Sequence, residues 1–116
     1  MIKVYGIKNC DSVKKARAWL ESKKIDYYFH DYRVDGITEK QIRQWIAELG
    51  LDVMVNKRST TWKEMDDKTK TSLNEKNAVK VFLEHPTLIK RPLLDNGKVR
   101  CVGFKEDEYK KILTPS

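Results

Sequence analysis

Cysteine, histidine and glycine are scarce in this chain, and each shortage excludes a class of protein. The two Cys and two His residues lie far apart in the 116-residue sequence, without the close spacing of metal ligands, so we predict no metal site. The five Gly residues form no glycine-rich phosphate loop. With so few Cys residues and no export signal, we expect a reducing, cytoplasmic environment and no structural disulfide.

Long hydrophobic runs are missing as well. No apolar stretch approaches the length of a membrane-spanning helix, and the N-terminus lacks the hydrophobic region of a secretory signal. We therefore expect no membrane contact. A chain of this length is expected to form a single domain, residues 1–116, that buries its own hydrophobic core, and we expect it to be a monomer.

The positive charge of the chain is not concentrated on any one segment. The net charge is +7, with 12 basic and 8 acidic residues in 1–60, and 12 basic and 9 acidic residues in 61–116. A nucleic-acid-binding module normally gathers its Lys and Arg residues on one element and interleaves them with exposed aromatic residues. The even spread therefore predicts no nucleic-acid binding and a mild preference for small anionic partners.

The first third of the chain has the pattern of a βαβ unit. A short apolar run at 2–5 predicts a buried strand that Gly6 ends, and a helical pattern begins at Asp11. Residues 25–32 then alternate between apolar and polar, which predicts a second strand. Two strands joined in this way by a helix should be parallel.

The middle of the chain, residues 37–85, is predicted to be almost wholly helical. Thr38 and Gln41 have the spacing of a capping box, and Gly50 is a natural end for the helix that follows them. A short helical piece is expected at 61–64, and a longer helix at 73–84, capped near Ser72. These helices interrupt strands that must belong to one sheet, so we interpret them as an inserted helical subdomain.

The last third predicts a hairpin and a closing helix. Asn96-Gly97 separates two apolar runs, 88–95 and 98–102, which is the usual signature of a two-residue type I′ hairpin. The pattern over 106–113 has acidic residues first and Lys residues last, as a helix dipole favours. The expected fold is α/β, with a mixed four-stranded sheet built as β-α-β followed by a β-hairpin and a helix.

Cys10 is the candidate for chemistry because it lies where the first strand gives way to a helix. The unpaired N–H groups and the dipole of a helix N-terminus both favour a thiolate, which is the nucleophilic form of Cys. Lys8 adds positive charge nearby. The alternative is a half-buried Cys that only fills space. Cys101 is expected to be a buried, inert thiol, with resolution of a disulfide on Cys10 as a minor possibility, and His30 is expected at the surface.

The order of elements is that of the thioredoxin-like fold, and four motifs resemble the arsenate reductase/Spx (ArsC-like) family over essentially the whole chain. They look most like its small YffB-like branch. The motifs, in chain order, are Tyr5-Gly6-Ile7-Lys8-Asn9-Cys10-Asp11, His30-Asp31-Tyr32-Arg33, Arg58-Ser59-Thr60-Thr61-Trp62 and Lys90-Arg91-Pro92-Leu93-Leu94.

The resemblance implies a role for several residues. The nucleophile of the family falls on Cys10, and an arginine that helps to bind the substrate oxyanion falls on Arg91. The proline that thioredoxin-like folds keep cis beside the thiol falls on Pro92. A second substrate-binding arginine corresponds to Arg58, with Lys57 as an alternative because the spacing differs by about a residue.

Three departures from the family pattern bear on activity. Arsenate reductases of this family have a His shortly before the nucleophile, where this chain has Gly6. Their third arginine would fall near Val102, and the neighbouring Arg100 is expected to point to the opposite face of its strand. The Spx regulators have a Cys-x-x-Cys switch, whereas no Cys follows Cys10 at that spacing. These departures count against arsenate reduction and against an Spx-type switch.

The hypothesis from the sequence is therefore a thiol-dependent reductase. Cys10 would form a mixed disulfide with glutathione or a similar small thiol as co-substrate, with no bound cofactor. Lys8, Asn9, Arg58, Arg91 and Pro92 are the predicted contacts of that anionic thiol. The alternative is an Spx-like regulatory or adaptor protein that binds a protein partner without catalysis.

Overall fold

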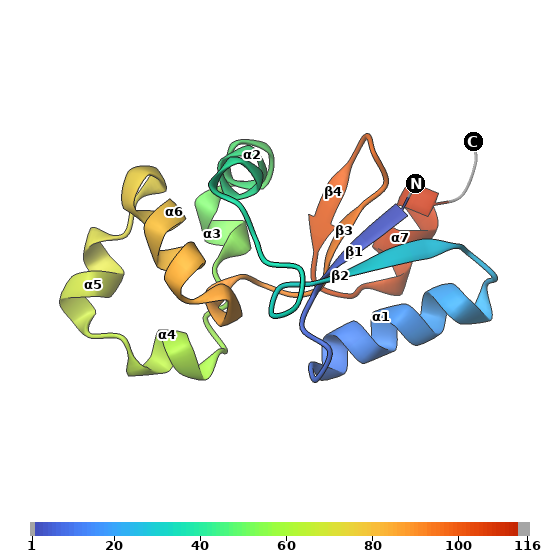
Figure 1. The fold of residues 1–116 in the computed structure, drawn as a ribbon, viewed down its shortest axis with the longest axis horizontal. Helices are drawn as coiled ribbons and strands as arrows, with labels where there is room; N and C mark the ends of the chain where they lie inside the picture. Colours follow the sequence, from blue (N-terminus) through green and yellow to red (C-terminus); the bar gives the residue numbers. More distant parts are fainter. Residues whose placement is uncertain (1, 114–116) are drawn as a thin grey trace. The chain divides into compact units, whose positions relative to one another are not determined.

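Four short strands form one mixed sheet in the spatial order β2-β1-β3-β4 (Figure 1). The computed structural model describes residues 2–113, and in it the strands span Ile2–Gly6 (β1), Tyr27–Asp31 (β2), Leu93–Asp95 (β3) and Arg100–Val102 (β4). β1 and β2 are parallel, whereas β3 runs antiparallel to both β1 and β4. The mixed four-stranded sheet is the one that the sequence predicts.

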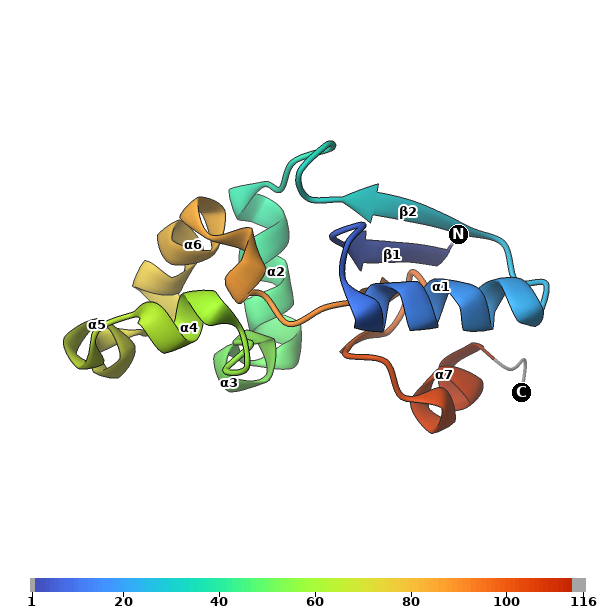
Figure 2. The same cartoon turned by 90° about the horizontal axis from the view of Figure 1, so that it is seen from below.

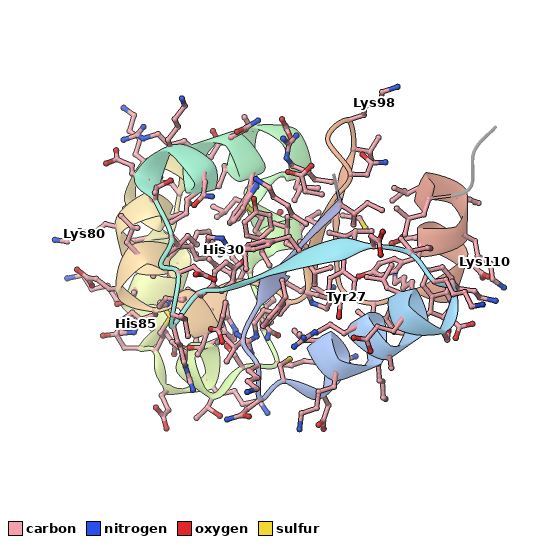
Figure 3. The ribbon with its side chains drawn as sticks, turned by 45° about the vertical axis from the view of Figure 1, so that its right-hand side comes forward. Tyr27, His30, Lys80, His85, Lys98 and Lys110 are labelled. Atoms are coloured by element: carbon pink, nitrogen blue, oxygen red, sulfur yellow. The ribbon has the colours of Figure 1, made fainter. Side chains whose placement is uncertain are left out.

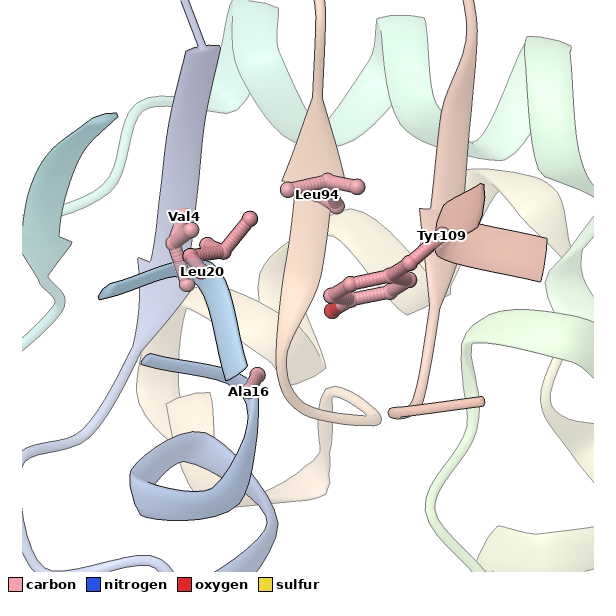
Figure 4. Close-up of a cluster of buried hydrophobic side chains, with 5 residues drawn as sticks. All are labelled: Val4, Ala16, Leu20, Leu94 and Tyr109. Carbon is pink, nitrogen blue, oxygen red and sulfur yellow. The ribbon is translucent and has the colours of Figure 1, made fainter. Parts of the chain in front are cut away.

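Two helices cover one face of this sheet. Helix α1 spans Asp11–Ser22 and connects β1 to β2, and helix α7 spans Glu106–Leu113 (Figure 2). Both helices pack on apolar side chains of the sheet, because such side chains lose contact with water there. The fully buried centre of this core, drawn in Figure 4, consists of Val4, Ala16, Leu20, Leu94 and Tyr109.

Gly6 is the last residue of the first strand, so the strand ends at the predicted glycine and includes it. Gly6 pairs with Asp31 in the parallel register, and the N–H of Tyr32 donates to the carbonyl of Gly6 over 2.9 Å. A glycine is required at this position for a packing reason. An added Cβ would lie 2.7 Å from a methyl group of Val13 in α1. The close approach of strand and helix sets the position of the loop that follows.

The remaining helices form a second compact unit, Gly36–Lys90, distinct from the unit that contains the sheet. Helices α2 and α6 pack on each other through their apolar faces, which hold Ile42, Trp45, Ile46, Ala78, Val79 and Phe82. The predicted helical insertion, 37–85, falls wholly within this unit. Its elements are α2 (Glu39–Leu49), α3 (Leu51–Met54), α4 (Thr60–Glu64), α5 (Asp67–Ser72), α6 (Glu75–Glu84) and the 3₁₀ turn η1 (Pro86–Leu88).

The caps of the two longer helices in this unit differ in how well the sequence predicts them. The capping box at α2 is confirmed, because Thr38 and Gln41 exchange side-chain and backbone hydrogen bonds. The cap expected near Ser72 for α6 was wrong. Asn74 caps that helix and forms a reciprocal pair with Asn77. The stretch before it is a separate short helix, α5, which the sequence analysis does not predict.

The hairpin exists, but its predicted register was wrong. Asp95 pairs with Arg100, so four residues, 96–99, form the loop, and not Asn96-Gly97 alone. A type I′ turn needs positive φ at both central residues, and only Gly97 of this pair has it, with φ 94°. The side-chain oxygen of Asn96 instead accepts hydrogen bonds from the N–H groups of Lys98 and Val99, which closes a wider loop.

No helix within residues 2–113 combines the length and the apolar character that a bilayer crossing requires.

Candidate functional site

Cys10 stands at the N-terminus of α1, at the end of a tight turn. Its N–H donates to the carbonyl of Ile7 over 3.2 Å, and its own carbonyl accepts the first helical hydrogen bond, from Lys14, over 2.9 Å. The residue has extended backbone angles, as an N-cap does, and its thiol is only partly buried. The turn therefore presents the sulfur to solvent in front of the first N–H groups of the helix.

The surroundings of the sulfur favour its ionised form. Partial burial raises the pKa of the Cys10 thiol, but hydrogen bonds from the N–H groups of Val13 and Ser12 and from the Arg91 side chain lower it. The positive charge of Arg91 adds to the lowering, and the net result is a pKa below the ordinary value of a thiol. Two independent parts of the chain, a helix terminus and a remote arginine, therefore act on one sulfur.

Arg91 reaches this position from the segment before β3. It is half-buried, and the Arg91–Pro92 peptide bond is cis, as the family resemblance implies. The carbonyl of buried Pro92 accepts a hydrogen bond from Gly103 over 2.8 Å, which ties the segment to the residue that follows β4. Arg91 and Cys10 belong to the same compact unit, so the chain holds the guanidinium and the thiol in one framework.

The other predicted contacts of the small thiol are in different situations. Lys8 and Asn9 are exposed on the loop before Cys10. The cation whose charge lowers the pKa of Cys10 is Arg91. Arg58 is exposed in the second unit, where its N–H donates to the Asn56 side chain over 3.2 Å. Its role at the site, and that of Lys57, stays a prediction.

A group of aromatic rings at the ends of β1 and β2 was not predicted. The ring of His30 lies 4.8 Å from that of Tyr5 and 6.3 Å from that of Tyr32, centroid to centroid. His30 is only partly exposed, because these rings cover part of its side chain. Burial raises the pKa of Tyr32 far above its ordinary value, although the charge of Arg91 opposes this. The parallel register, which pairs Tyr5 with His30, is the signal that could have found this group.

The two positions at which the chain departs from arsenate reductases have structural explanations. A side chain at Gly6 would meet Val13, so a histidine could not replace it without moving α1. Arg100 and Val102 lie two residues apart on β4 and therefore share one face, so the predicted opposite orientation of Arg100 was wrong. Arg100 forms an ion pair with Asp95 over 3.1 Å, and both side chains are largely buried. Its guanidinium is thus engaged by a carboxylate.

Cys101 differs from Cys10 in its electrostatic surroundings. It lies on β4, opposite Leu94, and contacts the buried core under α7. Burial, together with the negative charge of Glu108, raises the pKa of the Cys101 thiol to about 11. A raised pKa disfavours the nucleophilic thiolate, as expected for an inert thiol, although Cys101 is half-buried and not fully buried as the sequence analysis expected. Among residues 2–113, no three His, Cys, Asp or Glu side chains gather as a metal ion would require.

The chain resembles known proteins along nearly its whole length. The family model of ArsC matches residues 5–112. An uncharacterized protein of Haemophilus influenzae is 53% identical over 110 residues, which cover 94% of this chain and 96% of that protein. The global transcriptional regulator Spx 2 of Bacillus anthracis is 30% identical over 119 residues, which cover 100% of this chain and 89% of the regulator.

The fold is shared with a solved structure as well. The structure of a YffB protein matches with a TM-score of 0.92 at 42% identity, and the match covers 98% of this chain and 100% of that one. This likeness confirms the predicted fold class, a thioredoxin-like α/β fold with a mixed four-stranded sheet.

Proposed function

Because the chain belongs to the ArsC family, as its motifs predict, we propose that it is a thiol-dependent reductase whose redox-active residue is Cys10. The observation that supports this most is the pairing of a half-exposed thiol at a helix N-terminus with the guanidinium of Arg91. A thiolate stabilised from two sides remains ionised at a lower pH than a free Cys and can attack a sulfur. The inert environment of Cys101 leaves Cys10 as the reacting sulfur.

The proposed co-substrate is glutathione or a related small thiol. The Cys10 thiolate attacks the glutathione sulfur of a mixed disulfide substrate, a new S–S bond forms, and the substrate leaves as a thiolate. A second glutathione thiolate then attacks the glutathione sulfur on Cys10, which releases glutathione disulfide and restores the Cys10 thiolate. No adjacent Cys can resolve the intermediate, so an external thiol is part of the cycle.

Glutathione carries carboxylates, and its negative charge suits a site that contains Arg91. Arg91 can hold a carboxylate while it also stabilises the Cys10 thiolate. Exposed Lys8 and Asn9 on the preceding loop are the further contacts that we propose. Pro92 would flank the bound thiol. We further propose that the protein works as a monomer in the cytoplasm.

Arsenate reduction is not part of the proposal. The position of the family histidine is Gly6, which has no room for a side chain against Val13. Arg100 is bound by Asp95 and is not available to an oxyanion. Both observations favour an organic disulfide over an inorganic oxyanion as the substrate.

Intact-mass analysis after incubation with glutathione disulfide tests the proposal. We expect one glutathione to add to the protein, on Cys10, and to be removed by excess reduced glutathione. Cys10→Ser should abolish the addition, whereas the matched variant Cys101→Ser should retain it. Modification of Cys101 in place of Cys10, or no modification at neutral pH, would refute the reductase.

A second candidate is a regulatory or adaptor protein, which the 30% identity to an Spx regulator favours. Such a protein would bind a protein partner through its fold and would not need a reactive thiol. Cys10→Ser separates the two functions, since it should eliminate a reductase and leave partner binding intact. If the protein is a regulator or adaptor, affinity purification with the Cys10→Ser variant should recover the same partner as the unmodified chain.

A further inference from the structure

Within residues 2–113, β2 is an edge strand of the sheet, with β1 on one side and no strand paired to its other side (Figures 1 and 2). The N–H of Tyr32 donates inward to Gly6, whereas the N–H of Asp31 donates away from β1, to a carboxylate oxygen of Asp35, over 3.0 Å. Backbone N–H and C=O groups alternate in direction along a strand. Those of Tyr27 and Phe29 therefore point away from β1, as the N–H of Asp31 does. Asp35 covers the end at Asp31, and the part of the edge at Tyr27 and Phe29 is left for another strand.

Arg17 of α1 stands beside this part of the edge in a fixed orientation. Its Nε donates to the hydroxyl of Tyr27 over 3.0 Å, and its guanidinium carbon lies 4.3 Å from the centroid of the Phe29 ring. The Tyr27 hydroxyl in turn donates to Glu21 over 3.0 Å. Figure 3 shows Tyr27 between β2 and α1. Within residues 2–113, no carboxylate pairs with the terminal amino groups of Arg17, which leaves the fork available to a ligand.

A hollow of about 460 Å³ lies at this place, between α1 and the start of β2. Arg17 and Lys24 provide its positive charge, and Ile25, Tyr27 and Phe29 provide apolar surface. Two acidic residues also line it. Glu21 already accepts the Tyr27 hydroxyl, and exposed Asp26 is screened by water. The hollow therefore offers one oriented cation next to an apolar wall.

We propose that the open edge of β2 binds an extended acidic peptide segment of a partner protein by strand addition. The backbone of the segment pairs with Tyr27 and Phe29. One of its Asp or Glu side chains enters the hollow and forms a bidentate pair with Arg17. Side chains two residues apart on a strand share a face, so an apolar residue of the segment contacts Ile25. The net charge of +7 attracts such an acidic partner from solution.

This site uses no atom of Cys10 or Arg91, so it can be tested apart from the reductase. The probe is acetyl-Val-Thr-Glu-Thr-Val-amide, in which Glu and both Val side chains share one face of the strand, titrated into ¹⁵N-labelled protein and followed by NMR. We expect saturable shifts of the Tyr27 and Phe29 amide signals, equally in the Cys10→Ser variant. A peptide with Gln in place of Glu should bind at least about tenfold more weakly, because a hydrogen bond between charged groups is lost.

Three variants decide whether Arg17 recognises the carboxylate. Arg17→Gln should raise the dissociation constant about tenfold or more, and Arg17→Lys should fall between it and the unmodified chain. Lys110→Gln removes the same charge from α7, at an exposed residue that does not line the hollow, and should change the constant less than twofold. If Arg17→Gln loses its dispersed spectrum, Arg17→Lys alone provides the comparison.

Several outcomes would overturn the proposal. Equal weakening by Lys110→Gln would mean that only overall charge matters, and equal binding of the Gln peptide would mean that no carboxylate is recognised. Shifts that spare Tyr27 and Phe29 would place the peptide elsewhere. Self-association of the protein through this edge, detected by sedimentation without peptide, would make a second copy the occupant.

Discussion

Arg91 is the residue whose removal should most directly change the reactivity of Cys10. In Arg91→Met the length of the side chain is nearly kept, but the hydrogen bond and the charge that lower the pKa of the Cys10 thiol are lost. We expect that pKa to rise toward its ordinary value. The rate of alkylation by iodoacetamide at neutral pH should fall, by up to about tenfold for each unit regained, because only the thiolate reacts.

The control for this experiment is a second arginine of the same unit. Arg33→Met removes an exposed charge of the same kind, and Arg33 is not among the groups that act on Cys10. Its alkylation profile against pH should match that of the unmodified protein. An unchanged profile in Arg91→Met, measured by mass spectrometry on Cys10, would show that the helix terminus alone sets the reactivity.

Some residue roles could be predicted from the local sequence, and others only from the resemblance to a family. The position of Cys10 between a strand and a helix follows from the local pattern, which is why its surroundings could be anticipated. Arg91 lies some eighty residues away in the chain, and no local rule links it to the thiol. The ring contacts of His30 with Tyr5 and Tyr32 could not be anticipated, because they become visible only once the register of β1 and β2 is known.

At the scale of elements, the contact between β1 and α1 decides where the thiol stands. In Gly6→Ala a methyl group would be forced to 2.7 Å from Val13, which is fully buried. Overpacking of this kind costs about 1–3 kcal/mol of unfolding free energy. Val13→Ala also destabilises, because it leaves a cavity. The double variant should be less destabilised than the two single losses together predict, since the second change makes room for the first.

Urea denaturation of the four proteins measures this coupling. If the losses of unfolding free energy in the two single variants simply add in the double variant, α1 must shift away from the strand in Gly6→Ala and relieve the contact. In that event the alkylation rate of Cys10 in Gly6→Ala would change as well, because the shift would carry the helix N-terminus with it.

The elements that the sequence predicts well are those with a strong local signal. Apolar periodicity and a capping box specify α2, and both are found. Helix α5, Asp67–Ser72, has no apolar side chain, so no hydrophobic pattern could indicate it. The hairpin register failed for a different reason. The Asn96 side chain bonds to the backbone two and three residues ahead, and this local competition favours the four-residue loop over the tighter turn.

For the whole molecule, the two thiols should give the free energy of unfolding opposite dependences on pH. The pKa of Cys10 is lower in the folded protein than in the unfolded chain, so its thiolate stabilises the fold above the unfolded value. That contribution is lost as the pH falls through the lowered pKa. The pKa of Cys101 is raised to about 11, so its contribution is lost as the pH rises from about 8.5 toward that value.

Urea unfolding at a series of pH values, with Cys10→Ser and Cys101→Ala beside the unmodified chain, separates the two contributions. The difference between the unmodified chain and Cys10→Ser should grow as the pH rises to about 8.5 and then level off. The advantage of Cys101 over alanine should shrink at higher pH. The charge of Cys101 helps to raise the pKa of Tyr109, so the coupling between these two groups is part of the measured difference. If the difference in unfolding free energy between the unmodified chain and Cys10→Ser did not change with pH, Cys10 would be an ordinary thiol. If the difference between the unmodified chain and Cys101→Ala did not fall at high pH, Cys101 would be an accessible thiol. The sign of the two slopes thus reports, from global stability alone, which sulfur the fold keeps ready for reaction and which it keeps protonated.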